Sequence, residues 1–215
     1  MTPDEIRDAL RFYFITDDGA DAISALDQTR LAIDAGATMV QYRHKSFSLA
    51  DYEEVATIRQ LCRTRQVPFV VNDHVLLAKA VDADGVHVGQ DDTPPWQARQ
   101  VMGPQAIVGV SVSTMAELAR TDLSVCDYIG TGPVFPTGTK PDAKPVQGLD
   151  CLRNIVDHAS VPVVAIGGIG PANTMDCIAH GAVGVAVISC ITRAGDPVRA
   201  AQTMAAACGL RSPEA

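Results

Sequence analysis

Short apolar runs recur along the chain, and longer amphipathic stretches separate them. The runs are rich in Val and Ile and are bounded by Gly, Asp or Pro, a pattern typical of strands that are buried on both faces. Eight runs are predicted as strands, at residues 12–16, 39–43, 69–73, 85–89, 107–111, 127–132, 161–167 and 184–189. Between them, apolar residues at helical spacing predict helices at residues 21–35, 49–65, 96–102, 115–121, 149–158 and 173–180, with a shorter one within 75–84.

Eight strand–helix repeats of this kind predict an α/β fold, a single closed (β/α)8 or TIM barrel. An open doubly wound sheet is the alternative. Such a sheet gathers its ligand at one switch point, whereas here polar residues follow nearly every predicted strand. We expect one domain over residues 1–215, with the barrel at about 12–208, an extra N-terminal helix at 3–10 over the barrel floor and a short C-terminal tail at 212–215.

Composition narrows the class of protein further. A chain of 215 residues can bury a large single core, and its net charge of −8 argues against a nucleic-acid-binding protein. The first residues are acidic, and no apolar stretch is long enough to span a membrane, so we expect a cytoplasmic protein without a signal peptide. The six cysteines include no C-x-x-C pair, which disfavours zinc and dithiol chemistry, and Cys190 is expected to be structural. The expected partners are small phosphorylated molecules, and homo-oligomerisation stays open.

Charged residues follow three neighbouring predicted strands. Arg43 and Lys45 lie two positions apart, so both face the same side if the strand continues, where two cations can clamp one anionic group. Acids follow the next two strands, at Asp73 and at the doublet Asp91-Asp92. Carboxylates so close together repel unless a cation lies between them, which predicts a hard, oxygen-ligated ion such as Mg²⁺. The residues alone do not choose between Asp91 and Asp92, and helix capping is the alternative role for these acids.

Glycines and hydroxyl side chains follow the last three predicted strands. The polar positions are Thr137, Gly138, Thr139 and Lys140 in a Pro-rich loop, Gly167 and Gly168 after strand seven, and Ser189 after strand eight. Long interrupted loops of this kind are commonly binding loops or lids. Barrels often bind phosphate after strands seven and eight, where a missing Cβ lets the anion approach backbone N–H groups. This part of the chain therefore predicts a second anion site.

The two predicted anion sites indicate a class of reaction. A metal-bridged diphosphate at one and a phosphate at the other suggest a transferase that displaces pyrophosphate with a phosphorylated nucleophile. No carboxylate or histidine is obviously placed as a general base, so ionisation of the leaving group, helped by metal and lysine, is expected to supply most of the chemistry. His87 lies in mid-strand and is expected to be a hydrogen-bonded residue of the barrel interior, while His44 and His74 flank their motifs.

The chain resembles the thiamine phosphate synthase family through an ordered set of motifs. The resemblance runs from about Phe12 to the end of the last helix, and its most specific segment is Gly-x-Gly-Pro-x-Phe-Pro-Thr-x-Thr-Lys at 130–140. The other motifs are Gln-x-Arg-x-Lys at 41–45, Asn-Asp at 72–73, His-Val-Gly-Gln-Asp-Asp at 87–92, Gly-Val-Ser at 109–111, Ile-Gly-Gly-Ile at 166–169 and Ile-Ser at 188–189.

The resemblance implies a TIM-barrel transferase that joins 4-amino-2-methyl-5-(diphosphooxymethyl)pyrimidine to 4-methyl-5-(2-phosphooxyethyl)thiazole and releases pyrophosphate. The diphosphate leaves first, and the thiazole nitrogen attacks the resulting methylene cation. The residues implied for the pyrimidine diphosphate are Gln41, Tyr42, Arg43, His44, Lys45, Asn72, Ser111 and Lys140, of which Arg43, Lys45, Ser111 and Lys140 are the implied catalytic residues. Those implied for the thiazole phosphate are Thr137, Gly138, Thr139, Gly168, Ile188 and Ser189. Asp73 and Asp92 are the implied Mg²⁺ ligands, which selects the second acid of the doublet.

Two other interpretations of the motifs remain. A thiazole tautomerase of the same fold isomerises the thiazole phosphate and needs a proton shuttle but no diphosphate clamp, so the retained cations and acids argue against it. A non-catalytic barrel that binds phosphates and regulates a partner could lose the metal carboxylates, and this chain keeps them. Tyr42, His44 and Gly138 depart from residues common in the family, which affects substrate contacts but removes no charge that the reaction needs.

Overall fold

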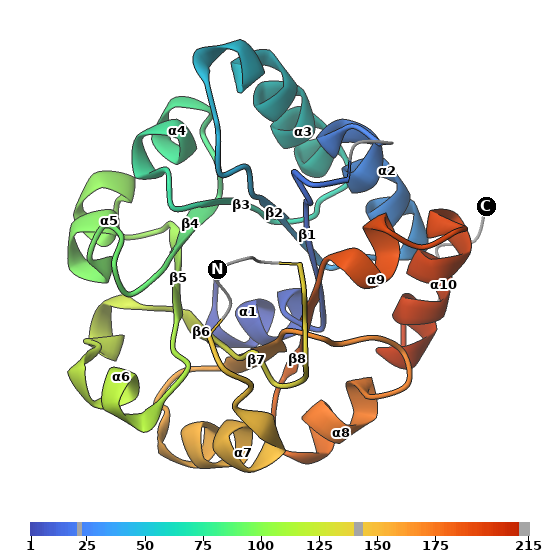
Figure 1. Ribbon diagram of the computed structural model, residues 1–215. Coiled ribbons are helices and arrows are strands. Elements are labelled where there is room, and N and C mark those ends of the chain that lie inside the picture. The colour runs from blue at the N-terminus through green and yellow to red at the C-terminus, as the bar shows by residue number, and fades with distance from the viewer. Residues whose placement is uncertain (21–22, 140–143, 211–215) are drawn as a thin grey trace.

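Eight parallel strands close into a barrel in the order β1 to β8, and helices surround it (Figure 1). The structure is a computed structural model that describes residues 1–20, 23–139 and 144–210. The strands are β1 Phe12–Ile15, β2 Met39–Tyr42, β3 Phe69–Asn72, β4 Gly85–Val88, β5 Ile107–Ser111, β6 Tyr128–Thr131, β7 Val163–Ile166 and β8 Gly184–Val187. β1 pairs with both β2 and β8, so that Tyr13 lies opposite Met39 on one side and Ala186 on the other. The predicted closed barrel is confirmed, and the open sheet is not formed.

The helices alternate with the strands and add short turns between them. They are α1 Pro3–Ala9, α2 Ala25–Ala35, η1 Leu49–Asp51, α3 Tyr52–Thr64, α4 Val75–Ala80, α5 Pro95–Met102, α6 Met115–Arg120, η2 Leu123–Val125, α7 Gly148–His158, α8 Thr174–Ala179, α9 Ser189–Thr192 and α10 Pro197–Ala207. α10 packs beside α2, so the last helix completes the ring around the barrel (Figure 1).

The alternation of side chains along each strand divides the core in two. In β1, Phe12 and Phe14 pack outward against the helices, whereas Tyr13 and Ile15 fill the barrel interior. All four side chains are buried, and full burial of a large apolar side chain contributes about 1.5–3 kcal/mol to stability. The two-residue period of strands thus builds both cores from one short apolar run.

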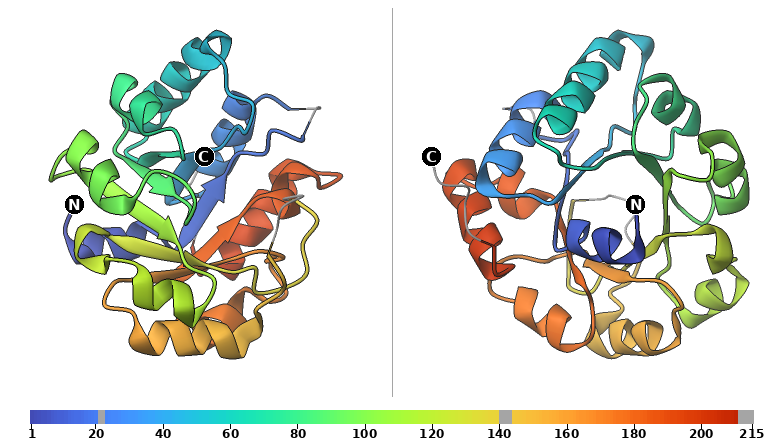
Figure 2. Two further views of the ribbon diagram at one scale, coloured as in Figure 1. Left: turned by 60° about the vertical axis from the view of Figure 1, so that its left-hand side comes forward. Right: turned by 180° about the vertical axis from the view of Figure 1, so that it is seen from behind.

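The predicted N-terminal helix is present and closes the floor of the barrel. Thr2 and Glu5 form a capping box at the start of α1, and Pro3 occupies the first helical position. Ile6 is buried in the same interior cluster as Tyr13. In the view from behind, α1 crosses the open end of the barrel (Figure 2, right). Since α1 leads directly into β1, it covers the amino ends of the strands and leaves the carboxyl ends for ligands.

Several predicted boundaries differ from the observed ones by a few residues, for local chemical reasons. The helix expected at 21–35 begins at Ala25, because Ser24 caps it by accepting a hydrogen bond from Asp27 N. The seventh strand begins at Val163, after a proline that cannot donate to a ladder, and ends at Ile166, before Gly167 turns to a φ of +95°. The short helix expected within 75–84 is α4. The tail at 212–215 lies outside the described residues.

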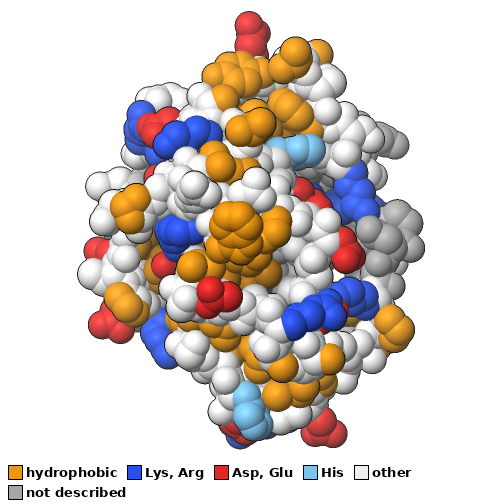
Figure 3. All heavy atoms as spheres, turned by 90° about the vertical axis from the view of Figure 1, so that its left-hand side faces the viewer, with side chains coloured by type: hydrophobic (Ala, Val, Ile, Leu, Met, Phe, Trp, Pro, Cys, Tyr) orange, Lys and Arg blue, Asp and Glu red, His pale blue; other side chains and the backbone are white. Residues whose placement is uncertain are grey.

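The outer surface carries no segment that could cross a bilayer, since no described helix is both long and apolar enough. On the side where α4 and α5 lie, apolar side chains occur among charged residues of both signs (Figure 3). The most exposed large apolar side chains include Leu49, Leu76 and Trp96, which lie in the first turns of η1, α4 and α5.

Candidate active site

A cavity of about 570 Å³ lies at the carboxyl ends of the strands. Every strand, or the segment directly after it, contributes side chains to the wall, as is usual for an active site in a barrel of this kind. The lining consists of Tyr13, Ile15, Gln41, Arg43, Lys45, Asn72, Asp73, His74, His87, Gly89, Gln90, Asp91, Asp92, Ser111, Ser113, Gly130, Gly132, Pro133, Thr137, Thr139, Lys144, Val164, Ile166, Gly167, Gly168, Ile169, Ala186, Val187, Ile188 and Ser189. Most of the residues predicted from the motifs therefore share one cavity.

Two cations reach the cavity from the end of β2. Arg43 is buried, and its backbone is held by Thr16, whose hydroxyl accepts from Arg43 N at 2.9 Å. Asp18 contacts both residues, with Oδ1 3.5 Å from Arg43 Nη1 and Oδ2 accepting from the backbone N of Lys45 at 2.8 Å. Asp18 was not predicted from the sequence, although the doublet Asp17-Asp18 directly follows the first apolar run. The Asp18 carboxylate therefore partly balances the positive charge of Arg43.

The two acids predicted to bind metal lie at the ends of neighbouring strands. Asp73 Oδ2 accepts from Asn72 Nδ2 at 2.6 Å, and the Asp73 backbone has a positive φ of 59°. Asp92 Oδ2 accepts from Gly89 N at 2.9 Å, and a Cβ at position 89 would lie only 2.6 Å from that oxygen. Neither acid caps the helix that follows it, because α4 and α5 have no side-chain cap.

The donor set suits a hard cation that keeps part of its hydration. No group of three or more His, Cys, Asp or Glu side chains that could hold a metal occurs in the described part of the chain. Two carboxylates facing one cavity are instead the kind of partial ligand set that Mg²⁺ takes when substrate phosphates and water complete its octahedron. The residues present therefore fit a metal held jointly by protein and substrate.

A chain of hydrogen bonds runs through the barrel interior below the cavity. Gln41 Nε2 donates to the Tyr13 hydroxyl at 2.6 Å, and the Tyr13 and Tyr128 hydroxyls lie 2.8 Å apart. Tyr128 Oη lies 3.0 Å from His87 Nδ1, and His87 Nε2 lies 2.9 Å from Ser111 Oγ. Burial raises the pKa of both tyrosines, so their hydroxyls stay protonated and available for hydrogen bonds. The expected interior role of His87 is confirmed.

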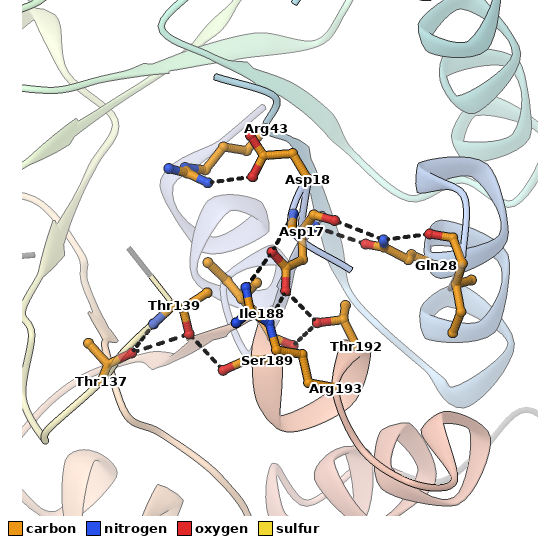
Figure 4. A network of polar contacts seen from close by, with 12 residues as sticks. Asp17, Asp18, Gln28, Arg43, Thr137, Thr139, Ile188, Ser189, Thr192 and Arg193 are labelled. Carbon is orange, nitrogen blue, oxygen red and sulfur yellow. Dashed lines mark hydrogen bonds and ion pairs between the residues drawn. The ribbon is translucent and has the colours of Figure 1, made fainter. Parts of the chain in front are cut away.

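The opposite wall is formed by the loop after β6 and by the ends of β7 and β8. Thr139 Oγ1 lies 2.7 Å from Ser189 Oγ at the start of α9, and Thr139 N donates to Thr137 Oγ1 at 3.3 Å (Figure 4). Gly168 has a φ of +65°, and a Cβ there would lie 2.8 Å from the backbone carbon of Phe135. Only glycine therefore fits between the two segments. Lys140, which the motifs place in this loop, lies outside the described residues.

Lys144, a charged residue that lines the cavity, and Glu117, the acid that it contacts, were not predicted from the sequence. Lys144 lines the cavity, and its Nζ donates to Glu117 Oε1 at 2.5 Å. Glu117 Oε2 also accepts from Ser113 N at 2.7 Å. Burial raises the pKa of Glu117, but the hydrogen bonds from Lys144 and Ser113 outweigh it and hold the pKa below its usual range. The only sequence signal for Lys144 was its position in the Pro-rich loop that also contains Thr137 and Thr139.

Among the predicted contact residues that the structure describes, three do not line the cavity: Tyr42, His44 and Gly138. Tyr42 is buried in the outer core, between the barrel and the helices, and its ring stacks on that of His44 with centroids 6.4 Å apart. Their roles toward a ligand stay predictions from the sequence. Burial raises the pKa of the Cys190 thiol to about 11, so this cysteine is not activated as a nucleophile.

Comparison with known proteins bears directly on this site. The sequence profile of the family described as thiamine monophosphate synthase matches residues 12–191. The chain belongs to the thiamine monophosphate synthase family. It is 46% identical over 201 residues to a thiamine-phosphate synthase of Chloroflexus aurantiacus, with 91% of each chain covered. It is 43% identical over 212 residues to the thiamine-phosphate synthase of Geobacillus thermodenitrificans, with 96% of each covered.

A solved structure of a related protein has the same fold. The thiamine phosphate pyrophosphorylase from Pyrococcus furiosus superposes with a TM-score of 0.85 at 37% sequence identity, covering 95% of this chain and 98% of that one. The span matched to the thiamine monophosphate synthase family begins with β1 and ends within α9. It therefore includes every segment that lines the cavity.

Proposed function

We propose that this enzyme joins the pyrimidine diphosphate to the thiazole phosphate, releasing pyrophosphate and forming thiamine phosphate. The proposal rests on the arrangement of one cavity. Arg43 and Lys45 lie on one wall with the carboxylates of Asp73 and Asp92. Thr139, Ser189 and Gly168 lie on another wall. One wall suits a metal-bound diphosphate and the other a phosphate. The names of the relatives at 46% and 43% identity agree with this reaction.

The diphosphate of the pyrimidine substrate is assigned to the wall formed by β2 to β5. Arg43 and Lys45 supply positive charge there, and Asn72 and Ser111 supply polar groups. Gln41 lies deeper in the barrel and donates a hydrogen bond to Tyr13. The pyrimidine ring of the substrate is assigned to this part of the barrel interior. Tyr42, His44 and Lys140 belong to the same assignment on the sequence alone.

A divalent metal is assigned to Asp73 and Asp92, and Mg²⁺ is the proposed ion. When bound, it would neutralise charge that develops on the departing pyrophosphate. The Asp73 and Asp92 carboxylates are negative, whereas Arg43 and Lys45 are positive. Charges of both signs are therefore present where pyrophosphate separates from the pyrimidine. Asp91 and Asp92 both line the cavity and are both exposed, so the choice of the second acid as the proposed ligand rests on the family resemblance.

The thiazole phosphate is assigned to Thr137, Gly138, Thr139, Gly168, Ile188 and Ser189. Support comes from the direct contact of the Thr139 and Ser189 side chains, which brings two hydroxyls together 2.7 Å apart. The positive φ of Gly168 also exposes its backbone where a Cβ would exclude an anion.

The proposed chemistry depends on charge and position rather than on a general base. Loss of pyrophosphate leaves a pyrimidine methylene cation, and the thiazole nitrogen attacks it from the neighbouring wall. Arg43, Lys45 and Lys140 stabilise the negative charge that accumulates on the leaving group, and binding in one cavity holds the two reacting atoms close together. The nitrogen lone pair carries no proton, so no base is needed for its attack.

The two other functions have less support. A tautomerase needs a proton shuttle in the cavity and has no use for paired cations beside paired acids. A regulator that only binds phosphates needs neither Asp73 nor Asp92. Three expectations stay predictions: a single domain over 1–215, a cytoplasmic location and the lack of nucleic-acid partners. The oligomeric state stays open.

The test of the proposed function is pyrophosphate release by the purified protein. The assay contains the pyrimidine diphosphate, the thiazole phosphate and Mg²⁺, with each omitted in turn, and thiamine phosphate is detected alongside. Release and product that require all three components support the synthase. Binding of thiazole phosphate without any release would support the tautomerase or the regulator instead.

A further inference from the structure

Asp17 is a buried carboxylate two residues after the end of β1, behind the cavity wall. Its Oδ2 accepts hydrogen bonds from Thr192 Oγ1 at 3.0 Å and from Arg193 Nε at 2.8 Å. Its Oδ1 accepts from Arg193 Nη2 at 3.1 Å and from Gly19 N at 3.1 Å. The side chain is 2% exposed, and an unpaired charge at that depth would cost a great deal of stability. Four donors compensate that charge, two of them from one guanidinium.

The backbone of Asp17 is fixed separately, by Gln28 of α2. Asp17 N donates to Gln28 Oε1 at 2.8 Å, and Gln28 Nε2 donates to Asp17 O at 3.0 Å and to Ile23 O at 2.9 Å. Figure 4 shows Gln28 on one side of Asp17, and Thr192 and Arg193 on the other. The carboxylate can therefore be changed without releasing the loop that carries it.

The segment that the Asp17 carboxylate holds is α9, which has only 4 residues. Isolated helices shorter than about 12–15 residues are marginal in water, so contacts with the rest of the protein must decide where α9 lies. At its start, Ser189 contacts Thr139 of the loop after β6. At its end, Thr192 and the following Arg193 contact Asp17 (Figure 4). Together with Ile191, which is buried in the outer core, these contacts hold Ser189 in place.

The Asp17–Arg193 pair acts on α9 and does not itself face the cavity. Burial raises the pKa of Asp17, but the hydrogen bonds from Arg193, Gly19 and Thr192 outweigh it and hold the pKa below its ordinary value. Asp17 is therefore ionised at neutral pH, and its charge is matched by the guanidinium. Among the described residues, neither Asp17, Thr192 nor Arg193 lines the cavity.

We propose that Asp17 is a positioning residue for the substrate phosphate that binds beside Ser189, acting through Thr192 and Arg193. The inference rests on the proposed function, because it names what holds one wall of that site. Asp18, the next residue, contacts Arg43 and Lys45 on the other wall. Since Gln28 holds the shared backbone, loss of the Asp17 charge should affect the thiazole phosphate and leave the pyrimidine diphosphate unaffected.

The test compares kinetic constants for the two substrates in Asp17→Asn and in the wild type. The expected result is a KM for thiazole phosphate raised about tenfold, with KM for the pyrimidine diphosphate and kcat at saturation changed less than about twofold. Asp34→Asn is the matched control, because it removes an Asp–Arg pair, with Arg65, whose side chains are 51% and 47% exposed. An equal rise in both KM values, or no rise in either, would overturn the proposal.

If Asp17→Asn does not fold, a second pair of variants tests the positioning role of Asp17. Thr192→Val removes the hydroxyl that Asp17 accepts from and keeps the side-chain shape, whereas Thr192→Ser keeps the hydroxyl. We expect a rise of about threefold in KM for thiazole phosphate in the Val variant and recovery in the Ser variant. Calorimetric binding of thiazole phosphate is measured in parallel. Weaker binding in Thr192→Val supports the positioning role, and unchanged binding rejects it. If the wild type releases no pyrophosphate, only the proposed function is rejected, because the binding measurement still tests the positioning role.

Discussion

The hydroxyl oxygens of Tyr13 and Tyr128 lie 2.8 Å apart inside the barrel, and their rings meet edge to face with centroids 5.9 Å apart. This contact joins two polar groups of the cavity, because Tyr13 accepts from Gln41 and Tyr128 contacts His87, which contacts Ser111. With a neutral His87, the Ser111 hydroxyl either accepts from the imidazole or donates to it. The buried tyrosines therefore influence which hydrogen-bonding group Ser111 offers to a ligand.

Tyr128→Phe should weaken both folding and binding of the pyrimidine substrate. The change leaves the Tyr13 hydroxyl and His87 Nδ1 without the oxygen that each contacts. We expect the free energy of unfolding to fall by about 1–3 kcal/mol, measured by urea denaturation, and KM for the pyrimidine diphosphate to rise severalfold. Tyr52→Phe, which removes a hydroxyl bonded to Ala80 O at 3.3 Å on the surface, is the control. Equal effects of the two changes would contradict the role of the interior chain.

Asp92→Ala should lower turnover strongly but preserve binding of the thiazole phosphate. Asp92 is one of the two proposed metal ligands, and the thiazole phosphate is assigned to the opposite wall. We expect kcat to fall by about 100-fold or more, because the developing charge on pyrophosphate loses its counterion. Calorimetry with thiazole phosphate checks that the other wall is intact. Asp91→Ala should lose much less activity, and the reverse order would assign the metal to the first acid of the doublet.

Glu117 should make the protein less stable in acid. Its folded pKa is held below the ordinary value of 4.5, so its ionised form contributes stability above about pH 4.5, and that contribution is lost as pH falls through the folded pKa. Glu117→Gln lacks this contribution at every pH. Unfolding free energies measured from pH 7 to pH 3 should therefore differ most at neutral pH and converge in acid, and a constant difference would exclude Glu117 as the cause.

The barrel could be predicted because each strand carries its own local signal. Runs such as Phe69–Asn72 and Val163–Ile166 are short, apolar and bounded by turn residues, and the glycines after helices mark where the chain turns back. The ends of elements were less predictable, because they depend on single hydrogen bonds such as the Ser24 cap. The side chains of Arg43 and Lys45 could also be predicted to share one site, since both follow one strand directly.

Other parts of the site depend on contacts that no local pattern contains. Asp17 and Arg193 are 176 positions apart in the chain, and only closure of β1 against β8 brings them together. Glu117 looks like an ordinary acid in the first turn of α6, yet it is buried and holds Lys144, 27 positions away. A sequence motif identifies residues that face a ligand more readily than residues that hold the ligand-binding residues in place.

Gly168→Ala should reduce activity through the backbone rather than through a lost side chain. Gly168 has a φ of +65°, and a Cβ there would approach the carbonyl oxygen of Pro136 and would lie 2.8 Å from the Phe135 backbone. The loop after β6 must then move away from β7 and take Thr137 and Thr139 with it. We expect KM for thiazole phosphate to rise by about tenfold or more, together with a loss of about 1–3 kcal/mol in stability from the strained backbone.

The matched control for this prediction is Gly195→Ala. A Cβ at Gly195 meets no atom within 4 Å, and its φ is not in the left-handed region, so the same chemical change should be tolerated. Steady-state kinetics with both substrates, together with urea denaturation, measure the two effects in each variant. If Gly168→Ala lowered stability without raising KM for thiazole phosphate, the glycine would serve packing alone, and the phosphate assigned to this wall would have to bind elsewhere in the cavity.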